Sequence, residues 1–127
     1  MDIALRTALM SKSKRLKVGA VLVLDKRILS VGFNGLPSGM EPDILEENNV
    51  TKPEVIHAEL NCILNCAKQG ISTLGATLYI THSPCQSCAS LIIQSGIKQI
   101  IYKDDYRTCT KSFLESMGVT IRRLIGY

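Results

Sequence analysis

Two short clusters contain residue types that bind metals and move protons. His57 and Glu59 form the pattern His-Ala-Glu, and Cys85 and Cys88 form the pattern Pro-Cys-Gln-Ser-Cys. Cysteines three positions apart at the start of a helix point to the same side, so both sulfurs can reach one ion. Free backbone N–H groups and the helix dipole favour thiolates there. We therefore predict a zinc site formed by His57, Cys85 and Cys88, with Glu59 left free for proton transfer.

Three protein ligands leave a fourth coordination position open, which is typical of a catalytic rather than a structural zinc. A different site would use four cysteines, Cys62, Cys66, Cys85 and Cys88. However, Cys62 and Cys66 are expected in the middle of a helix, off its apolar stripe, and a four-cysteine site leaves the histidine and glutamate without a role. We interpret Cys62, Cys66 and Cys109 as packing residues or free thiols. The second histidine, His82, is predicted to lie near the metal or at the surface without binding it.

The elements that must position these residues follow from periodicity and from Gly and Pro signals. Apolar residues on one stripe (Ile56, Leu60, Ile63, Leu64 and Ala67) predict that the helix carrying His57 packs through that stripe. The pattern predicts helices over 1–12, 55–68, from Pro84 to Gly96 and over 108–117, strands over 18–24, 28–33, 76–81, 98–102 and 119–124, and a loop over 34–53. Helical crossovers favour parallel neighbours, so the predicted fold is α/β, a three-layer α/β/α arrangement around a mixed five-stranded sheet with the last strands parallel.

Length and composition limit the classes of protein. A chain of 127 residues, 46% hydrophobic and 20% charged, fits one globular domain, residues 1–127. It contains no apolar run of about 18 residues and no signal-peptide order, so we expect a cytoplasmic protein without a membrane partner. The net charge of +4 suits an anionic ligand but is too small to indicate nucleic acid.

Five sequence blocks resemble the deoxycytidylate (dCMP) deaminase branch of the cytidine/deoxycytidylate deaminase superfamily. The zinc motifs match the H-x-E and P-C-x-x-C pattern of zinc deaminases. The wider match covers nearly the whole chain and is carried by residues 11–20 (SKSKRLKVGA), 32–37 (GFNGLP), 56–61 (IHAELN), 83–89 (SPCQSCA) and 91–98 (LIIQSGIK). The second and last of these blocks are more specific than the zinc motifs alone.

The resemblance implies hydrolytic deamination of dCMP to dUMP and ammonia, which supplies dUMP for thymidylate synthesis. It implies one zinc per chain, because the loop over 35–54 lacks the cysteines and histidines of a second site. Glu59 would carry protons to N3 of cytosine and to the leaving amine. The implied substrate-binding residues are Asn34 for the sugar, Ser11, Arg15 and Lys17 for the phosphate, and Ala58 and Tyr106, the last of which would close over the substrate.

The resemblance also implies a homo-oligomer, such as a hexamer, and makes dCTP and dTTP candidate allosteric effectors, as in larger members of the family. Two other functions compete with it. A nucleic-acid deaminase, acting on tRNA adenosine or single-stranded DNA cytosine, would need a wider basic groove and more stacking aromatics than the 5% present here. A zinc-stabilised binding module would need no Glu59.

Overall fold

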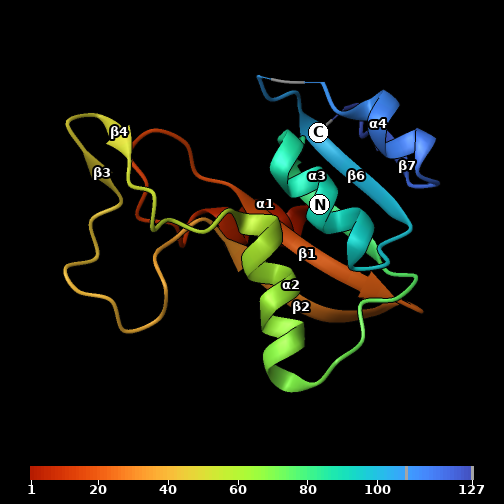
Figure 1. The fold of residues 1–127 in the computed structure, drawn as a ribbon, viewed down its shortest axis with the longest axis horizontal. Helices are drawn as coiled ribbons and strands as arrows, with labels where there is room; N and C mark the ends of the chain where they lie inside the picture. Colours follow the sequence, from red (N-terminus) through yellow and green to blue (C-terminus); the bar gives the residue numbers. More distant parts are fainter. Residues whose placement is uncertain (108, 127) are drawn as a thin grey trace.

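The computed structural model describes residues 1–107 and 109–126. Its centre is a five-stranded sheet in the order β2-β1-β5-β6-β7 (Figure 1). The strands of this sheet are β1 (Gly19–Leu24), β2 (Arg27–Phe33), β5 (Thr77–His82), β6 (Gln99–Asp104) and β7 (Thr120–Arg123). The helices are α1 (Asp2–Ala8), α2 (Ala58–Gln69), α3 (Gln86–Gln94) and α4 (Lys111–Ser116). Within these residues, no helix is long and apolar enough to cross a bilayer.

The strand directions confirm the predicted mixed sheet. β1 runs antiparallel to β2 and to β5, whereas β5, β6 and β7 are parallel. The tight turn between β1 and β2 is formed by Asp25 and Lys26, whose φ angles are 50° and 64°. Two consecutive residues with positive φ match the right-handed twist of a hairpin. The parallel strands need crossovers, which α3 and α4 provide.

Two glycines let helices approach the sheet from opposite faces. A Cβ at Gly19 would lie 2.6 Å from the backbone nitrogen of Ala8 in α1, and a Cβ at Gly32 would lie 2.5 Å from that of Cys62 in α2. Gly32 is paired with Ala20, the residue after Gly19, and successive residues of a strand face opposite ways. Thus α1 covers one face and α2 the other, which confirms the three predicted layers.

Replacing Gly32 by alanine should destabilise the fold by about 1–3 kcal/mol, because the new methyl group would overlap backbone that cannot move without displacing α2. Chemical unfolding measures this change. Gly35→Ala is the control, since its Cβ would meet only the Phe33 ring, at 3.5 Å. Equal unfolding free energies for the two variants would contradict the close approach.

The helix α2 buries a different face from the predicted apolar stripe. Its buried residues are Ala58, Glu59, Cys62 and Cys66, whereas Leu64 is 45% exposed. The predicted stripe is therefore wrong. The reason is the close approach at Gly32, where small side chains fit between helix and sheet and branched ones do not. Cys62 and Cys66 are free thiols in the core, as the packing interpretation predicts.

The segment between β2 and α2 is more ordered than the predicted loop over 34–53. It contains the paired strands β3 (Glu46–Glu47) and β4 (Val50–Thr51), which form an arm away from the main sheet (Figure 1). The Glu46 carboxylate accepts hydrogen bonds from Ser13 Oγ at 2.8 Å and from the Lys14 backbone nitrogen at 3.1 Å. These contacts attach the arm to the basic segment before β1. The first helix, α1, is also shorter than the predicted helix over 1–12. The predicted start of the last helix, Thr108, lies outside the described residues.

Candidate metal and substrate site

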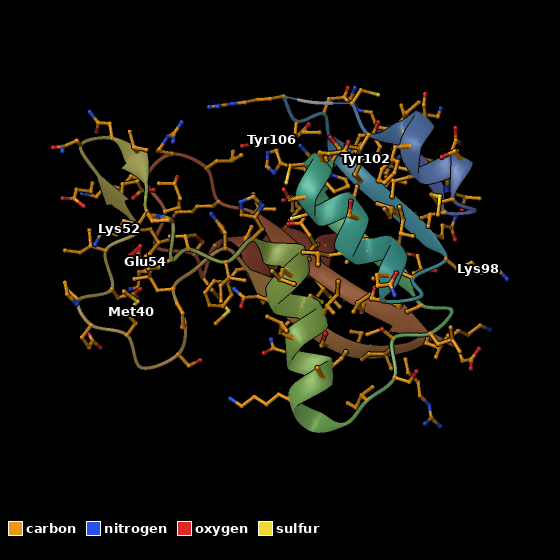
Figure 2. The ribbon with its side chains drawn as sticks, in the orientation of Figure 1. Met40, Lys52, Glu54, Lys98, Tyr102 and Tyr106 are labelled. Atoms are coloured by element: carbon orange, nitrogen blue, oxygen red, sulfur yellow. The ribbon has the colours of Figure 1, made fainter. Side chains whose placement is uncertain are left out.

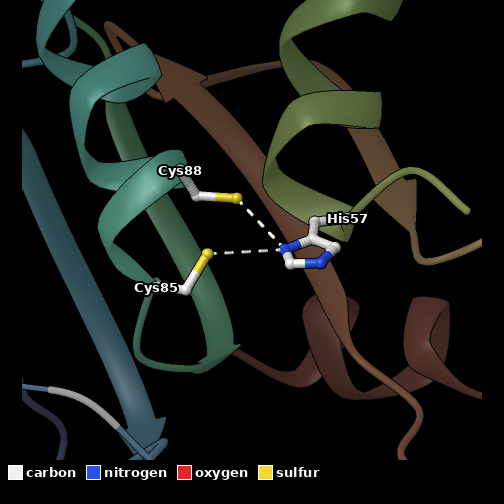
Figure 3. Close-up of side chains that lie close together, drawn as sticks. All are labelled: His57, Cys85 and Cys88. Atoms are coloured by element: carbon white, nitrogen blue, oxygen red, sulfur yellow. Dashed lines mark hydrogen bonds between the residues drawn. The ribbon is translucent and has the colours of Figure 1, made fainter. Parts of the chain in front are cut away.

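The three predicted metal ligands converge at one edge of the sheet. His57 is the residue before α2, Cys85 is the residue before α3, and Cys88 lies in the first turn of α3. The strand β5 lies between these helices in sequence and ends at the same edge. His57 Nδ1 lies 3.2 Å from Cys88 Sγ and 3.7 Å from Cys85 Sγ (Figure 3). All three ligand atoms lie within 4.8 Å of one another, as one ion requires.

The chemistry of this group fits zinc. Two thiols and one imidazole are a donor set that zinc prefers. Burial, together with the neighbouring Glu59 and Cys85, raises the pKa of the Cys88 thiol. The negative charges of Glu59 and Cys85 would repel a Cys88 thiolate. A cation bound between His57, Cys85 and Cys88 would offset that repulsion and hold the two thiols as thiolates. Among the described residues, no other His, Cys, Asp and Glu side chains form such a group, so the four-cysteine alternative is not supported.

Glu59 lies in the first turn of α2 but outside the ligand group. Its residue surface is only 5% exposed. Burial raises the pKa of the Glu59 carboxyl above its ordinary value, and its own backbone N–H, His57 and Cys88 offset part of that effect. A carboxyl whose pKa is moved towards neutrality can both accept and donate a proton, which is the property of a general acid and base.

A cavity of about 440 Å³ opens at the metal group. This volume is within the range of small-molecule sites. Its lining includes Glu59 and two of the predicted metal ligands, His57 and Cys85, together with the exposed basic side chains of Arg15 and Arg107. The lining residues are Ser13, Arg15, Leu16, Val18, Asn34, Thr51, Val55, His57, Ala58, Glu59, His82, Ser83, Cys85, Tyr106 and Arg107.

Four of the predicted substrate-binding residues line this cavity, namely Arg15, Asn34, Ala58 and Tyr106. Ser11 and Lys17 are not in its lining. The Ser11 hydroxyl is buried and donates a hydrogen bond to the Asn34 carbonyl at 2.8 Å. It therefore joins the basic segment before β1 to Asn34. Lys17 is exposed outside the cavity.

The Asn34 side chain fastens the segment before β1. Its Oδ1 accepts a hydrogen bond from the Val18 backbone nitrogen at 2.9 Å, and its Nδ2 donates one to the Leu16 carbonyl at 2.8 Å. An amide has two donor hydrogens and two acceptor lone pairs, so one of each remains for a ligand. Asn34 therefore both builds the cavity wall and can contact what the cavity holds.

His82 also belongs to the cavity wall, which sequence reasoning placed only near the metal or at the surface. Thr81 Oγ1 accepts a hydrogen bond from the Gly19 backbone nitrogen at 3.2 Å and lies 2.9 Å from His82 Nδ1. The Thr81 hydroxyl can then donate to Nδ1, which leaves the ring proton on Nε2. Burial lowers the pKa of His82, and this favours the neutral ring even though Asp104 opposes it.

Sequence reasoning did not assign several residues of the cavity lining to the site. Ser13, Leu16 and Val18 lie in the same segment as the predicted Arg15. Ser83 directly precedes Pro84 of the cysteine motif, so its place beside the motif was a usable signal. Thr51 and Val55 come from the arm and the chain after it, and Arg107 comes from the loop after β6. Nothing local to those residues marks them, because only tertiary packing brings their segments to the metal.

Comparison with known proteins agrees with this geometry. Residues 1–104 match the family model for the cytidine and deoxycytidylate deaminase zinc-binding region. The chain belongs to this family. Its mixed five-stranded sheet with parallel β5, β6 and β7 is the fold of a solved dCMP deaminase, and the predicted resemblance is confirmed. The protein is a zinc-binding deaminase domain, and its His57, Cys85 and Cys88 form a group that could hold the metal ion.

Individual relatives extend the match beyond the motif region. ComE operon protein 2 of Bacillus subtilis is 40% identical over 124 residues, which cover 92% of this chain and 65% of that protein. Human deoxycytidylate deaminase is 37% identical over 139 residues, which cover 98% of this chain and 77% of that protein. The cyanophage S-TIM5 dCMP deaminase, solved with dCMP and dUMP, superposes with a TM-score of 0.93 at 37% identity and covers 97% of this chain and 92% of its own.

Proposed function

We propose that this chain is a zinc-dependent dCMP deaminase, which converts dCMP and water to dUMP and ammonia and so supplies dUMP for thymidylate synthesis. One observation carries the proposal: the buried carboxyl of Glu59 lies beside a His-Cys-Cys metal group, in a cavity whose rim has exposed arginines. This arrangement suits a polar base at the inner end and a phosphate at the outer end. Relatives named deoxycytidylate deaminase support it.

The reaction requires proton transfers that one carboxyl can perform. Zinc, when bound, acts as a Lewis acid and lowers the pKa of water. Glu59 accepts a proton as the water oxygen adds to C4 of cytosine, and it delivers a proton to N3. It then takes the proton of the new C4 hydroxyl and passes it to the departing amine, so that the C4 carbonyl forms, the C4–N bond breaks and ammonia leaves. Because the cavity buries Glu59, bulk water competes little for these protons.

The substrate is held by groups at different depths. Ala58 is next to Glu59 and lies with it at the inner wall, where the base binds. Asn34 keeps one donor and one acceptor for the sugar. Tyr106 covers the base from the loop after β6, and Arg15 at the rim binds the phosphate. Ser11 contributes by supporting Asn34, and Lys17 contributes a positive charge outside the cavity.

Replacing Arg15 by alanine should lower kcat/KM for dCMP by about 10- to 100-fold, because a charge-assisted hydrogen bond contributes about 1.5–3 kcal/mol. Deoxycytidine, which lacks the phosphate, should lose much less. Ammonia release from both substrates measures the difference. Arg27→Ala, at an exposed cation of β2, is the control for a general change in charge. A uniform loss on both substrates would assign Arg15 a folding role instead.

A nucleic-acid deaminase is the alternative that the substrate comparison tests directly. The solved tRNA A34 deaminase shares the fold, with a TM-score of 0.68 at 24% identity. The decisive assay measures ammonia release from dCMP, deoxycytidine, an RNA hairpin and single-stranded DNA. Equal rates on dCMP and deoxycytidine would refute the phosphate assignment, and a preference for either polymer would replace the proposed substrate.

The wider context is also part of the proposal. Residues 1–127 act as one deaminase domain in the cytoplasm, and several copies assemble into a homo-oligomer such as a hexamer, regulated by dCTP and dTTP. Exposed apolar side chains on the outer helices, among them Leu64 and Leu91 at 45% and 43% exposure, support association. Light scattering with and without each nucleotide tests both parts.

A further inference from the structure

A second arginine reaches the cavity from a segment distant in sequence from the first. The two basic residues that the resemblance assigns to the phosphate are Arg15 and Lys17, which both precede β1. Arg107 belongs instead to the loop after β6, yet it lines the same cavity as Arg15. Both arginines are exposed, as the rim of a site for a hydrated anion requires. The cavity lining therefore contains arginines supplied by two separate segments.

The loop that carries Arg107 is held against the metal-binding segment. The Ser83 backbone nitrogen donates to the Asp104 carbonyl at 2.9 Å, and the Tyr106 backbone nitrogen donates to Ser83 Oγ at 2.7 Å. Ser83 lies two residues before the metal ligand Cys85. Tyr106 accordingly lies at the end of the molecule where α3 begins (Figure 2). The residue after Tyr106 is thus placed relative to the metal group.

The two acidic residues before Tyr106, at the end of β6 and the start of the loop, are paired with cations other than Arg107. Asp104 pairs with Lys103 at 3.1 Å, and Asp105 pairs with Arg123 of β7 at 3.1 Å. Arg123 Nε also donates a hydrogen bond to the Lys103 carbonyl at 2.9 Å, which connects β7 to the end of β6 where the loop begins. Among the described residues, neither carboxylate forms an ion pair with Arg107.

The two rim arginines are left with charge to offer a ligand. None of the ion pairs within the described ranges includes Arg15 or Arg107. Arg15 has a long hydrogen bond to Thr51 Oγ1 at 3.4 Å, and the Arg107 guanidinium lies 6.0 Å from the centre of the Tyr106 ring. A guanidinium that lies over a ring face keeps its edge N–H groups free for bidentate contact with phosphate.

We propose that Arg107 binds the 5′-phosphate of the nucleotide together with Arg15, so that the phosphate bridges the segment before β1 and the loop after β6. This inference rests on the proposed function and extends its phosphate site by a residue that sequence reasoning did not assign. Because Arg107 adjoins Tyr106, a phosphate bound to Arg107 also positions the Tyr106 ring over the base. Selectivity for the nucleotide over the nucleoside then depends on both arginines.

The test compares Arg107→Ala and Arg107→Lys with the wild-type holoenzyme on dCMP and deoxycytidine. For Arg107→Ala we expect kcat/KM for dCMP to fall by about 10-fold or more, mainly through KM, with a much smaller change for deoxycytidine. Lysine keeps the charge but not the planar fork, so Arg107→Lys should lie between alanine and wild type. Lys111→Ala, at an exposed cation of α4 outside the cavity lining, is the matched control.

Inhibition by inorganic phosphate gives a second measurement that does not depend on turnover of the nucleotide base. Phosphate should compete with dCMP in the wild type and compete about 10-fold more weakly after Arg107→Ala. If the wild type prefers dCMP but both Arg107 variants keep the same preference and phosphate inhibition, this inference is overturned while the proposed function stands. Parallel losses on both substrates would also overturn it, since they indicate loop structure alone. A wild type that does not distinguish dCMP from deoxycytidine would overturn the proposed function itself.

Discussion

Replacing Glu59 by glutamine should lower kcat for dCMP by about 10²- to 10⁴-fold, the usual contribution of a general acid and base. Glutamine has nearly the same shape but cannot take up or release the proton. Because Glu59 lies outside the metal group, zinc content should stay near wild type. The melting temperature should not fall, since the substitution removes a buried carboxyl whose pKa burial has raised. Ammonia release, metal analysis and thermal unfolding measure the three quantities.

Glu115→Gln is the matched control, because Glu115 is an exposed glutamate of α4 far along the chain from the site. It should show wild-type turnover. Full activity after Glu59→Gln would contradict the proton-transfer role and would favour a binding module that merely uses zinc for stability. Loss of zinc together with activity would instead mean that the carboxyl maintains the metal group.

Removing zinc should abolish turnover and also destabilise the protein. A ligand that binds only the folded chain contributes about 4 kcal/mol when its free concentration is a thousandfold above Kd. Without the ion, no cation offsets the repulsion between a Cys88 thiolate and the buried Glu59 carboxylate. Chelation should therefore lower the melting temperature, and adding zinc back should restore both stability and activity.

Cysteine variants separate the metal group from the other thiols. Cys85→Ser should lose zinc and turnover, because Cys85 is one of the three proposed ligands. Cys109→Ser should keep both, because Cys109 is an exposed free thiol outside the group. Retention of stoichiometric zinc by the Cys85→Ser protein would show that the ion is held elsewhere.

Much of the fold was predictable because the local signals agreed with it. The apolar strand runs, the polar turn at Asp25 and Lys26 and the glycines after the helices led to the observed sheet. The face of α2 was not predictable from hydrophobicity alone. Its packing is decided by the backbone approach at Gly32, which admits Cys62 and leaves Leu64 exposed.

The sequence alone predicted the chemistry of the site, because ligand type and spacing at two helix starts leave few alternatives to a zinc group with a free glutamate. Local helical geometry and the one strand between the two helices were enough to predict that His57, Glu59, Cys85 and Cys88 lie together. Tertiary structure decided which side chains form the rest of the cavity. Arg107, Thr51 and His82 reach it because the loop after β6, the arm and the end of β5 contribute to one cavity, which depends on contacts between residues far apart in the chain.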